Sequence, residues 1–326
     1  MRRRELIVGS GYLAAAWSFV ARAQQPAMPV IGFLHGQRSD GFGYRLAYLH
    51  AGLNELGFVE GRNVTVEYRW ANNQMEQLPT LAVDLVRRRV AVIVAPDGTA
   101  SPLAAKAVTT TVPIVFVMGA DPVKLGLIAS LNKPSGNLTG VNTILWELAG
   151  KRLEFLCELV PQATTIGYLI DPRSPVTGEI ESVRAAAREL RRQIIVVEAR
   201  SDTEFEPAFA SLAQRGATAL LINSGVMFTG NRDKLVALAA RYQIPTIYPF
   251  RIFAVDGGLM SYGGVDMEAH RLAGVYVGQI LKGARAADLP VQQPSKFELV
   301  INLKTARALR IAVPPTLRAL ANEVIE

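Results

Sequence analysis

Short clusters of polar and aromatic side chains follow the apolar segments of this chain, and they are the residues able to bind a small molecule. Hydroxyl, amide and guanidinium groups donate hydrogen bonds to carboxylates, carboxylates accept them from ammonium groups, and aromatic rings stack on flat apolar ligands. The candidate ligand-binding residues are His35, Gln37, Ser39, Asp97, Thr99, Ser101, Met118, Asp121, Asp171, Arg173, Asn223, Ser224, Tyr248, Arg251 and Tyr262. This mixture suits a polar solute with an apolar part.

Each candidate also has a purely structural role open to it. Thr99 and Ser101 precede or begin an expected helix, where they would bind a ligand carboxylate or simply cap the helix. Asp121, which stands before Pro122, would hold an ammonium group or serve as a cap. Arg251 would pair with a ligand carboxylate or with an acid on the protein surface. The aromatic candidates would stack on the ligand or pack in the core.

Patterns for catalysis and for metal binding are weak in this sequence. Neither a G-x-S-x-G elbow nor an H-E-x-x-H motif is present. The histidines are too far apart in the sequence for a metal pattern, and we expect His35 to order its loop. Asp97 and Asp171 are conceivable as an acid/base pair, but a structural role in their loops is the better interpretation. We therefore expect no catalytic residue, no metal and no cofactor.

The candidate residues need a scaffold in which the carboxyl ends of strands meet. Apolar runs of strand length, such as Val30–His35 and Val90–Ala95, alternate with amphipathic runs of helix length, such as 44–56 and 77–89. This alternation predicts right-handed βαβ units and a mainly parallel sheet. The pattern repeats from residue 165, so we predict an α/β protein with two doubly wound parallel-sheet lobes. Helices are also expected at 123–131 and 315–324.

The stretch 257–283 indicates how the two lobes are connected. Its periodicity changes from that of a strand to that of a helix across Gly263-Gly264, and Asp266 is placed to cap the helix. The chain then returns as a strand at 296–302, as expected if it crosses from one lobe to the other and back. The predicted domains are an N-terminal lobe of 26–142 plus 264–290 and a C-terminal lobe of 143–263 plus 291–326.

Residues 1–23 have the three parts of a secretory signal peptide. Arg2–Arg4 form a basic region, residues 6–20 carry no charge, and Ala21-Arg22-Ala23 is an A-x-A cleavage site. The uncharged run is shorter than the roughly 20 apolar residues that span a membrane. We expect cleavage near Ala23 and a mature protein free in a bacterial periplasm, exported by the general or the twin-arginine route.

Two further observations limit the function. Gly9–Ala14 matches the glycine fingerprint of dinucleotide-binding proteins, but it lies within the signal peptide and lacks the helix and second strand that the fingerprint needs. The formal net charge is +7, of which the signal peptide holds four arginines and one glutamate, and no basic cluster is interleaved with aromatic residues. We therefore expect no nucleic-acid partner. Cys157 is the only cysteine and is expected to be a buried small hydrophobe.

Several motifs spread over the mature chain together carry a family resemblance. They are I-G-F-L-H-G at 31–36, L-G-F-V-E-G-R-N-V at 56–64, P-S-G-N-L-T-G-V at 134–141, I-P-T-I-Y-P at 244–249, G-G-L-M-S-Y-G at 257–263 and the strand at 297–302. With them the chain resembles the ABC-transporter substrate-binding proteins of the tryptophan/tyrosine-binding type. The resemblance implies a type I periplasmic-binding-protein fold that closes around a ligand. It also implies delivery to a membrane permease driven by a separate ATPase.

We therefore expect the periplasmic substrate-binding component of an ABC uptake transporter. It would act as a monomer and capture a small solute, an aromatic or other amino acid being one candidate, in the cleft between its lobes. One alternative is a periplasmic hydrolase that uses cleft carboxylates, and another is a ligand-sensing receptor module of the same fold. A sugar-sensing transcription regulator would carry a helix-turn-helix where this chain has its export signal.

Overall fold

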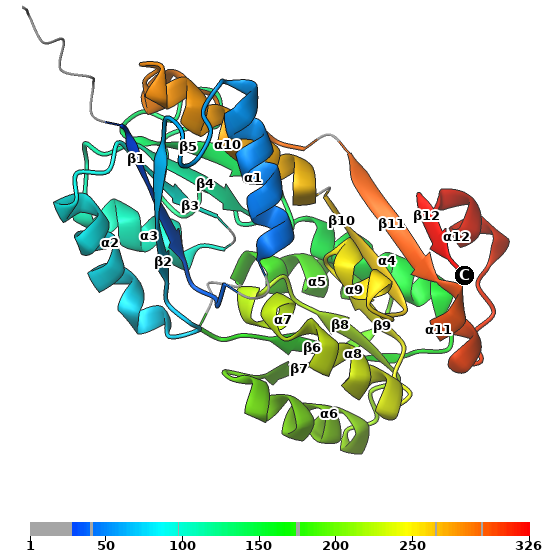
Figure 1. Cartoon of the computed structure of the whole chain (residues 1–326). Coiled ribbons are helices and arrows are strands. Elements are labelled where there is room, and N and C mark those ends of the chain that lie inside the picture. Colours follow the sequence, from blue (N-terminus) through cyan, green and yellow to red (C-terminus); the bar gives the residue numbers. More distant parts are fainter. Residues whose placement is uncertain (1–27, 40–41, 97, 174–176, 265, 295) are drawn as a thin grey trace, which may run out of the picture.

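The structure is a computed structural model of the whole chain, and it describes residues 28–326 apart from 40–41, 97, 174–176, 265 and 295. The chain forms two α/β lobes, each with its own mainly parallel sheet (Figure 1). The predicted fold class is therefore confirmed. The predicted signal peptide and the glycine fingerprint lie outside the described residues. Within the part that is described, none of the helices has the length and apolar character needed to span a membrane.

The first lobe contains a five-stranded sheet in the order β2-β1-β3-β4-β5, and all its neighbouring strands are parallel. Its elements are β1 (Val30–His35), α1 (Gly43–Glu55), β2 (Thr65–Trp70), a short 3-10 turn (Met75–Gln77), α2 (Leu78–Arg87), β3 (Val92–Ala95), α3 (Ala100–Val108), β4 (Ile114–Met118) and β5 (Leu138–Asn142). The helix α10 (Asp266–Leu281) also packs on this lobe, although it comes from much later in the chain.

The second lobe contains a seven-stranded sheet in the order β12-β11-β10-β9-β8-β6-β7. Its first half comprises α4 (Leu148–Leu159), β6 (Thr165–Ile170), α5 (Thr177–Glu189), β7 (Gln193–Glu198), α6 (Phe205–Gln214) and β8 (Ala219–Ile222). It continues with α7 (Val226–Gly230), α8 (Arg232–Arg241), β9 (Thr246–Tyr248), α9 (Arg251–Val255), β10 (Met260–Gly264), β11 (Phe297–Asn302), α11 (Leu303–Ala308), α12 (Pro315–Leu320) and β12 (Glu323–Ile325). From β7 to β10 the strand order repeats that of the first lobe, and β11 is antiparallel to β10.

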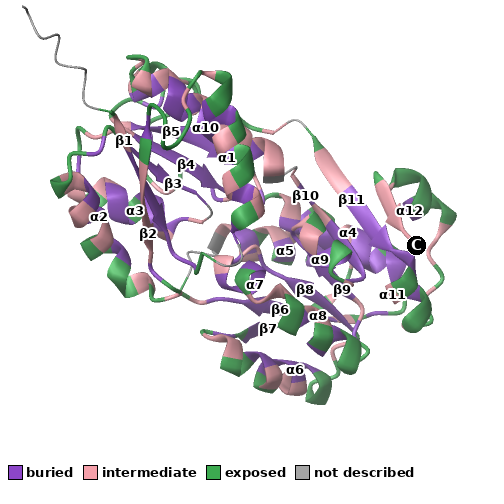
Figure 2. Ribbon diagram, viewed as in Figure 1, coloured by how far each residue is buried: buried purple, intermediate pink, exposed green. Residues whose placement is uncertain are grey.

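The side chains of β1 show why helices cover both faces of the sheet. Ile31 and Phe33 enter the core beneath α1 and α10, whereas Leu34 enters the core beneath α2 and α3. Side chains along a strand point alternately to opposite faces of the sheet. A strand whose odd-numbered and even-numbered positions are both apolar must therefore be covered on both faces. Figure 2 shows the strands of both lobes as largely buried, with exposed residues mainly on helices and loops.

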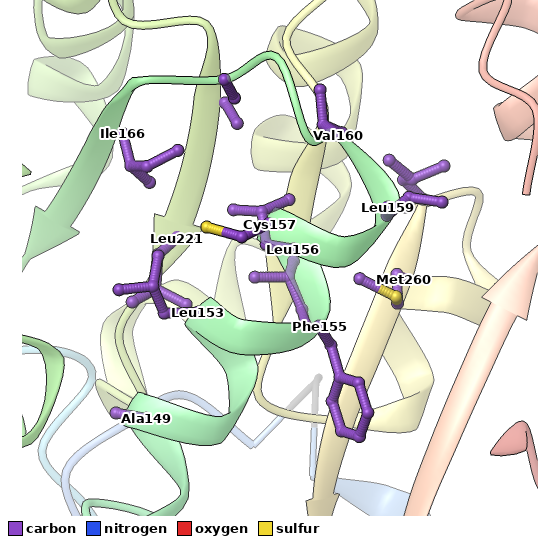
Figure 3. Packing of buried hydrophobic residues seen from close by; sticks show 14 of the residues in the cluster. Ala149, Leu153, Phe155, Leu156, Cys157, Leu159, Val160, Ile166, Leu221 and Met260 are labelled. Atoms are coloured by element: carbon purple, nitrogen blue, oxygen red, sulfur yellow. The ribbon is translucent and has the colours of Figure 1, made fainter. Parts of the chain in front are cut away.

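The core of the second lobe includes the only cysteine of the chain. Leu153, Leu156 and Cys157 of α4 lie side by side against Ile166 and Leu221 of the sheet (Figure 3). Cys157 is 6% exposed, and burial raises the pKa of its thiol. The prediction that Cys157 acts as a buried hydrophobe is confirmed.

The chain passes between the lobes after β5, after β10 and before β11. In the first of these crossovers, the backbone N–H and the hydroxyl of Thr143 both donate to the carbonyl oxygen of Met118, at 2.7 and 3.1 Å. The side chain of Asn142 accepts from the N–H of Ile144, which has a φ of 47°. A β-branched residue rarely adopts this left-handed conformation, so these bonds hold the crossover in a shape that its sequence does not favour.

Two predicted helices are wrong in whole or in part. Residues 123–131 form turns, because Asp121 accepts from the N–H groups of Val123 and Lys124 and the left-handed Gly126, with a φ of 66°, interrupts the helix. The C-terminal helix α12 ends at Leu320 instead of continuing to residue 324. The backbone and side chain of Asn322 bond to Leu299, and residues 323–325 then pair with β11.

The helices α1 and α10 approach each other so closely that their backbones touch. A Cβ atom on Gly52 would overlap the carbonyl oxygen of Arg271, and one on Gly274 would overlap the carbonyl oxygen of Leu49. Only glycine permits this approach, which brings the late helix α10 onto the first lobe. Arg271 adds ion pairs with Glu55 of α1 and with Glu268 of its own helix.

We predict that Gly274→Ala lowers the free energy of unfolding by at least about 2 kcal/mol, because overpacking against a backbone atom forces the helices apart. Urea unfolding followed by circular dichroism measures this change. Gly43→Ala is the matched control, because a Cβ on Gly43 meets nothing within 4 Å. That variant should be neutral or up to about 1 kcal/mol more stable, since alanine favours the helix. Equal effects of the two substitutions would contradict the proposed crossing.

Candidate functional site

A cavity lies between the lobes, where the carboxyl ends of the strands of both sheets face each other. Its wall comes from the loops after β1, β3 and β4 on one side and after β6, β8 and β9 on the other, together with the crossover that follows β5. The centre of a water-sized sphere can occupy about 70 Å³ of it, which is room for several water molecules or one small solute. This is where ligands bind in open α/β sheets.

The first lobe contributes the beginning of α3. Thr99 and Ser101 line the cavity and are only 6% and 2% exposed. Within the described part of the chain, neither hydroxyl has a hydrogen-bond partner, and α3 begins without a side-chain cap. The first N–H groups of a helix have no partner inside the helix and carry a partial positive charge. This corner of the cavity therefore offers several hydrogen-bond donors to an anionic group.

Two buried polar residues of the first lobe reach the second lobe. The side-chain amide of Gln37 donates a hydrogen bond to the carbonyl oxygen of Val226, at the start of α7. The guanidinium of Arg45, on α1, lies 5.4 Å from the ring centroid of Phe250, which follows β9. Both residues are less than 5% exposed and both line the cavity. The lobes are thus in contact across the cavity.

The second lobe contributes a carboxylate that is already paired. Both side-chain oxygens of Asp171 accept from the guanidinium of Arg173, at 3.0 and 2.8 Å. The backbone N–H of Arg173 donates to the same carboxylate at 3.0 Å. The hydrogen bond to Asp171 raises the pKa of Arg173. Asp171 is therefore held as an internal partner of the loop.

A buried ion pair lies behind the wall that the second lobe forms. Arg152 of α4 and Glu179 of α5 are both fully buried, and they are joined by a 2.8 Å hydrogen bond. Arg152 also donates to the carbonyl oxygen of Leu145 in the crossover, at 3.2 Å. Burial raises the pKa of Glu179, an effect opposed by the charge of Arg152 and by donors from Ser224. The pair connects two helices to the crossover and to the loop after β8.

The loop after β8 is fixed by the same carboxylate. Ser224 donates to Glu179 from its hydroxyl at 2.9 Å and from its backbone N–H at 3.2 Å. The side-chain amide of Asn223 donates to Glu179 at 3.4 Å, and its oxygen accepts from the N–H of Gly225 at 3.1 Å. These side chains line the cavity, but their donors are used to hold its wall in place.

Most of the remaining wall is apolar, apart from Thr143 and Thr229. Its largest side chains are Met75, Met118, Leu145, Trp146, Met227 and Phe250. Methionine adapts to ligands of different shape, and aromatic rings favour flat partners. The backbone N–H of Trp146 donates to the carbonyl oxygen of Gly119, which follows β4. This bond holds the crossover against the first lobe.

This geometry can be compared with known proteins. A family model described as ABC transporter substrate binding protein matches residues 40–325. The chain belongs to this family. The family and the solute-binding role that the sequence predicted for this substrate-binding protein are thereby confirmed, together with the type I periplasmic-binding-protein fold.

Individual relatives of this substrate-binding protein agree with that assignment. A tyrosine-binding protein of Clostridioides difficile (strain R20291) is 27% identical over 260 residues, which are 79% of this chain and 74% of that protein. The ABC domain in complex with L-Trp from Streptococcus pneumonia superposes with a TM-score of 0.82 at 23% identity, over 91% of this chain and 99% of that chain. A conserved domain protein from Vibrio cholerae gives a TM-score of 0.83 at 22% identity, again over 91% and 99%.

The structure brings part of the predicted site together and places the rest elsewhere. The candidates that line the cavity are Gln37, Thr99, Ser101, Met118, Asp171, Arg173, Asn223 and Ser224. Asp97 lies outside the described residues. The other six candidates, described next, lie outside the cavity wall.

His35 is fully buried, and its ring lies 4.4 Å from that of Phe42, while its Nδ1 accepts from the N–H of Gln37. It thus orders the loop that carries Gln37, as the sequence suggested. Tyr248 is fully buried and stacks on Phe253 at 4.7 Å, because the alternation of side chains along β9 turns it into the core. Neither ring is part of the cavity wall.

Arg251 forms a bidentate ion pair with Glu323 of β12, at 2.6 and 2.7 Å. It therefore pairs with an acid on the protein surface, which was the structural role expected for it. Tyr262 packs edge-on against Phe155 at 4.8 Å on the face of the sheet beneath α4. Asp121 caps the turn described above, and Ser39 is exposed outside the cavity wall.

Several cavity residues were missed from the sequence, and of two with large polar or aromatic side chains, Arg45 and Trp146, only Arg45 left a signal. Arg45 lies four residues before Leu49 and eight before Leu53, so it shares the buried face of α1, where a charge is unusual. That position could have been noticed. Trp146 belongs to a crossover without a regular pattern, and nothing local shows that it turns towards the cavity.

We predict that Arg152→Met lowers the free energy of unfolding by about 3–5 kcal/mol, because it leaves the Glu179 carboxylate buried without its cation. Equilibrium urea unfolding measures the loss. The double variant Arg152→Met with Glu179→Leu should recover part of it, since no lone charge then remains. If the two single losses simply add in the double variant, the pair does not act as a unit.

Proposed function

We propose that this protein captures a small solute in the cavity between its lobes and presents it, enclosed, to a membrane permease with a cytoplasmic ATPase. The observation that carries the proposal is the cavity between the lobes, where the hydroxyl groups of Thr99 and Ser101, two largely buried residues at the start of α3, have no protein partner within the described residues. Buried polar groups normally have partners. A ligand would supply them here.

The wall of the cavity indicates the kind of solute. Donors gather at the start of α3, and Trp146, Phe250 and the methionines form the apolar part. A carboxylate attached to a flat or flexible apolar group fits both. The related proteins named for tyrosine and found with L-Trp make aromatic amino acids and their derivatives the first candidates to test.

The rest of the proposal concerns the setting of this protein. Residues 1–23 direct export and are removed near Ala23, and the mature monomer acts in the periplasm. It is a binding protein without catalytic activity. The hydrolase alternative needed Asp171 as an acid or base, but that carboxylate accepts hydrogen bonds from Arg173 on both oxygens. A ligand-sensing receptor module of the same fold would use the same binding site and would differ only in its protein partner.

A thermal-shift screen of the mature protein with amino acids, aromatic acids and other small metabolites tests the proposal. At least one solute should raise the melting temperature, because a ligand that binds only the folded state stabilises it. Turnover of an ester or glycoside, without stabilisation by any solute, would replace the proposal with the enzyme alternative.

We predict that Ser101→Ala weakens capture of the best solute from that screen by about tenfold or more, as expected for a lost hydrogen bond to a charged group. Isothermal titration calorimetry measures the affinity. Ser39→Ala and Arg251→Ala are matched controls, because neither side chain lines the cavity. Both should bind with unchanged affinity. A loss in the controls equal to that in Ser101→Ala would show that the site lies elsewhere.

We predict that Gln37→Ala weakens binding of the same solute by roughly two- to tenfold, because it removes one hydrogen bond that joins the lobes across the cavity. Small-angle scattering with and without solute should show incomplete compaction at solute concentrations that close the unchanged protein. Full compaction at those concentrations would mean that the contact with Val226 does not stabilise the closed form.

A further inference from the structure

The short helix α7 of the second lobe touches the first lobe at two points beside the cavity. The side-chain amide of Gln37 donates to the carbonyl oxygen of Val226 and lies over Gly230, where an added Cβ would stand 3.1 Å from the amide nitrogen. The side chain of Val226 in turn lies against Gly98, in the loop after β3, where an added Cβ would stand only 2.7 Å from Cγ2 of the valine. Each lobe thus offers one glycine to a side chain of the other.

The second lobe holds α7 in a fixed position. Phe228 is fully buried and packs against Phe205, with the ring centroids 5.7 Å apart. The side-chain amide of Asn231 donates to the carbonyl oxygen of Met227 at 2.9 Å. Because α7 is packed into its own lobe, it moves with that lobe. Its two contacts with the first lobe therefore form and break together when the lobes close and separate.

The first lobe holds its side of the contact in a similar way. The backbone N–H of Gln37 donates to Nδ1 of His35 at 3.1 Å, and the carbonyl oxygen of Gln37 accepts from the N–H of Asn72 at 3.3 Å. Gly98 has a φ of 101°, in the region that favours glycine. Two surfaces that are already ordered lose little conformational entropy when they meet, so their contact contributes directly to closure.

We propose that α7 is a latch, which holds the lobes together over the solute by placing Val226 on Gly98 and Gly230 beneath Gln37. The inference rests on the proposed function and adds to it how the closed form is held. A solute that favours the closed form binds with an apparent affinity that depends on the closure equilibrium. A change in the latch therefore multiplies the dissociation constant of every solute by one factor, and the order of preference among solutes stays the same.

An exchange of size across the two lobes tests the latch by isothermal titration calorimetry. Gly98→Ala should weaken binding of each solute from the thermal-shift screen by roughly tenfold, because its Cβ collides with Val226 when the lobes close. Val226→Ala removes the methyl groups, and alone it should weaken binding by only about two- to fivefold. The double variant should bind within about threefold of Val226→Ala. Failure of this rescue, or a changed order of preference among solutes, would overturn the proposal.

Gly57→Ala is the control for backbone strain in these variants. Gly57 has a φ of 87°, but a Cβ there meets nothing within 4 Å. This variant should bind every solute with unchanged affinity, and far-ultraviolet circular dichroism confirms that all the variants fold. If Gly57→Ala lost as much affinity as Gly98→Ala, strain in the first lobe would explain the loss and the latch would be rejected.

A cross-link tests the contact without any solute. The native Cys157 is buried, so the new thiols of Gly98→Cys combined with Val226→Cys are the accessible ones. The Cβ of Val226 is one bond from its Cγ2, so the two new Cβ atoms lie within the roughly 4.5 Å over which a disulfide forms. Air oxidation catalysed by copper phenanthroline should join them, and solute should accelerate the reaction. Gly57→Cys with Val226→Cys should give no cross-link. Electrophoresis without reductant measures the product, and its absence at saturating solute would overturn the contact.

These outcomes separate the inference from the proposed function. If solutes bind but the size exchange shows no rescue, the protein is still a solute-binding protein and only the latch falls. If the cross-link forms and no solute of the wider screen binds, the proposed function falls, whereas the contact between α7 and the first lobe stands.

Discussion

The buried ion pair between Arg152 and Glu179 is the interaction on which the geometry of the binding cavity depends. One guanidinium and one carboxylate, both fully buried, connect two helices, the crossover at Leu145 and the loop that carries Ser224. A buried ion pair tolerates few arrangements, because separating its two members leaves each charge uncompensated in the protein interior. The pair therefore fixes where the wall of the second lobe stands. The side chains that line the cavity are positioned by a group that the solute never touches.

The two walls of the cavity differ in the hydrogen-bonding groups that they present. The first lobe presents donors at the start of α3 that have no protein partner within the described residues, and the second lobe presents side chains such as Asp171 and Asn223 whose polar groups are already paired. Contacts between the lobes come from Gln37 and Arg45 of the first lobe. In the proposed function, a solute bound by the donors of the first lobe would be enclosed by the second lobe, whose paired side chains hold that wall in place.

The sequence predicted the location of the site better than the direction of its side chains. Strand periodicity predicted that the loops after β1, β3, β4, β6 and β8 lie at the carboxyl ends of the strands of the two sheets. Those loops do line the cavity. It could not show that Tyr248 lies in the core, because Tyr248 is the last residue of β9 and the sequence does not say whether the strand ends before or after it. Nor could it show that Arg173 occupies Asp171, since pairing within a loop depends on the loop's conformation. Trp146 lies in a crossover, where no period exists to interpret.

The glycine crossing of α1 and α10 has a consequence for how the chain is made. Five strands of the first lobe are complete at residue 142, but Ala273 and Val277 of α10 fill the core above them. A nascent chain that ends before α10 leaves that apolar face open to water and to other chains. The lobe whose synthesis begins first is thus completed only after strands β6 to β10 of the second lobe have been made. Until the later helix emerges, the unfinished half is prone to aggregation.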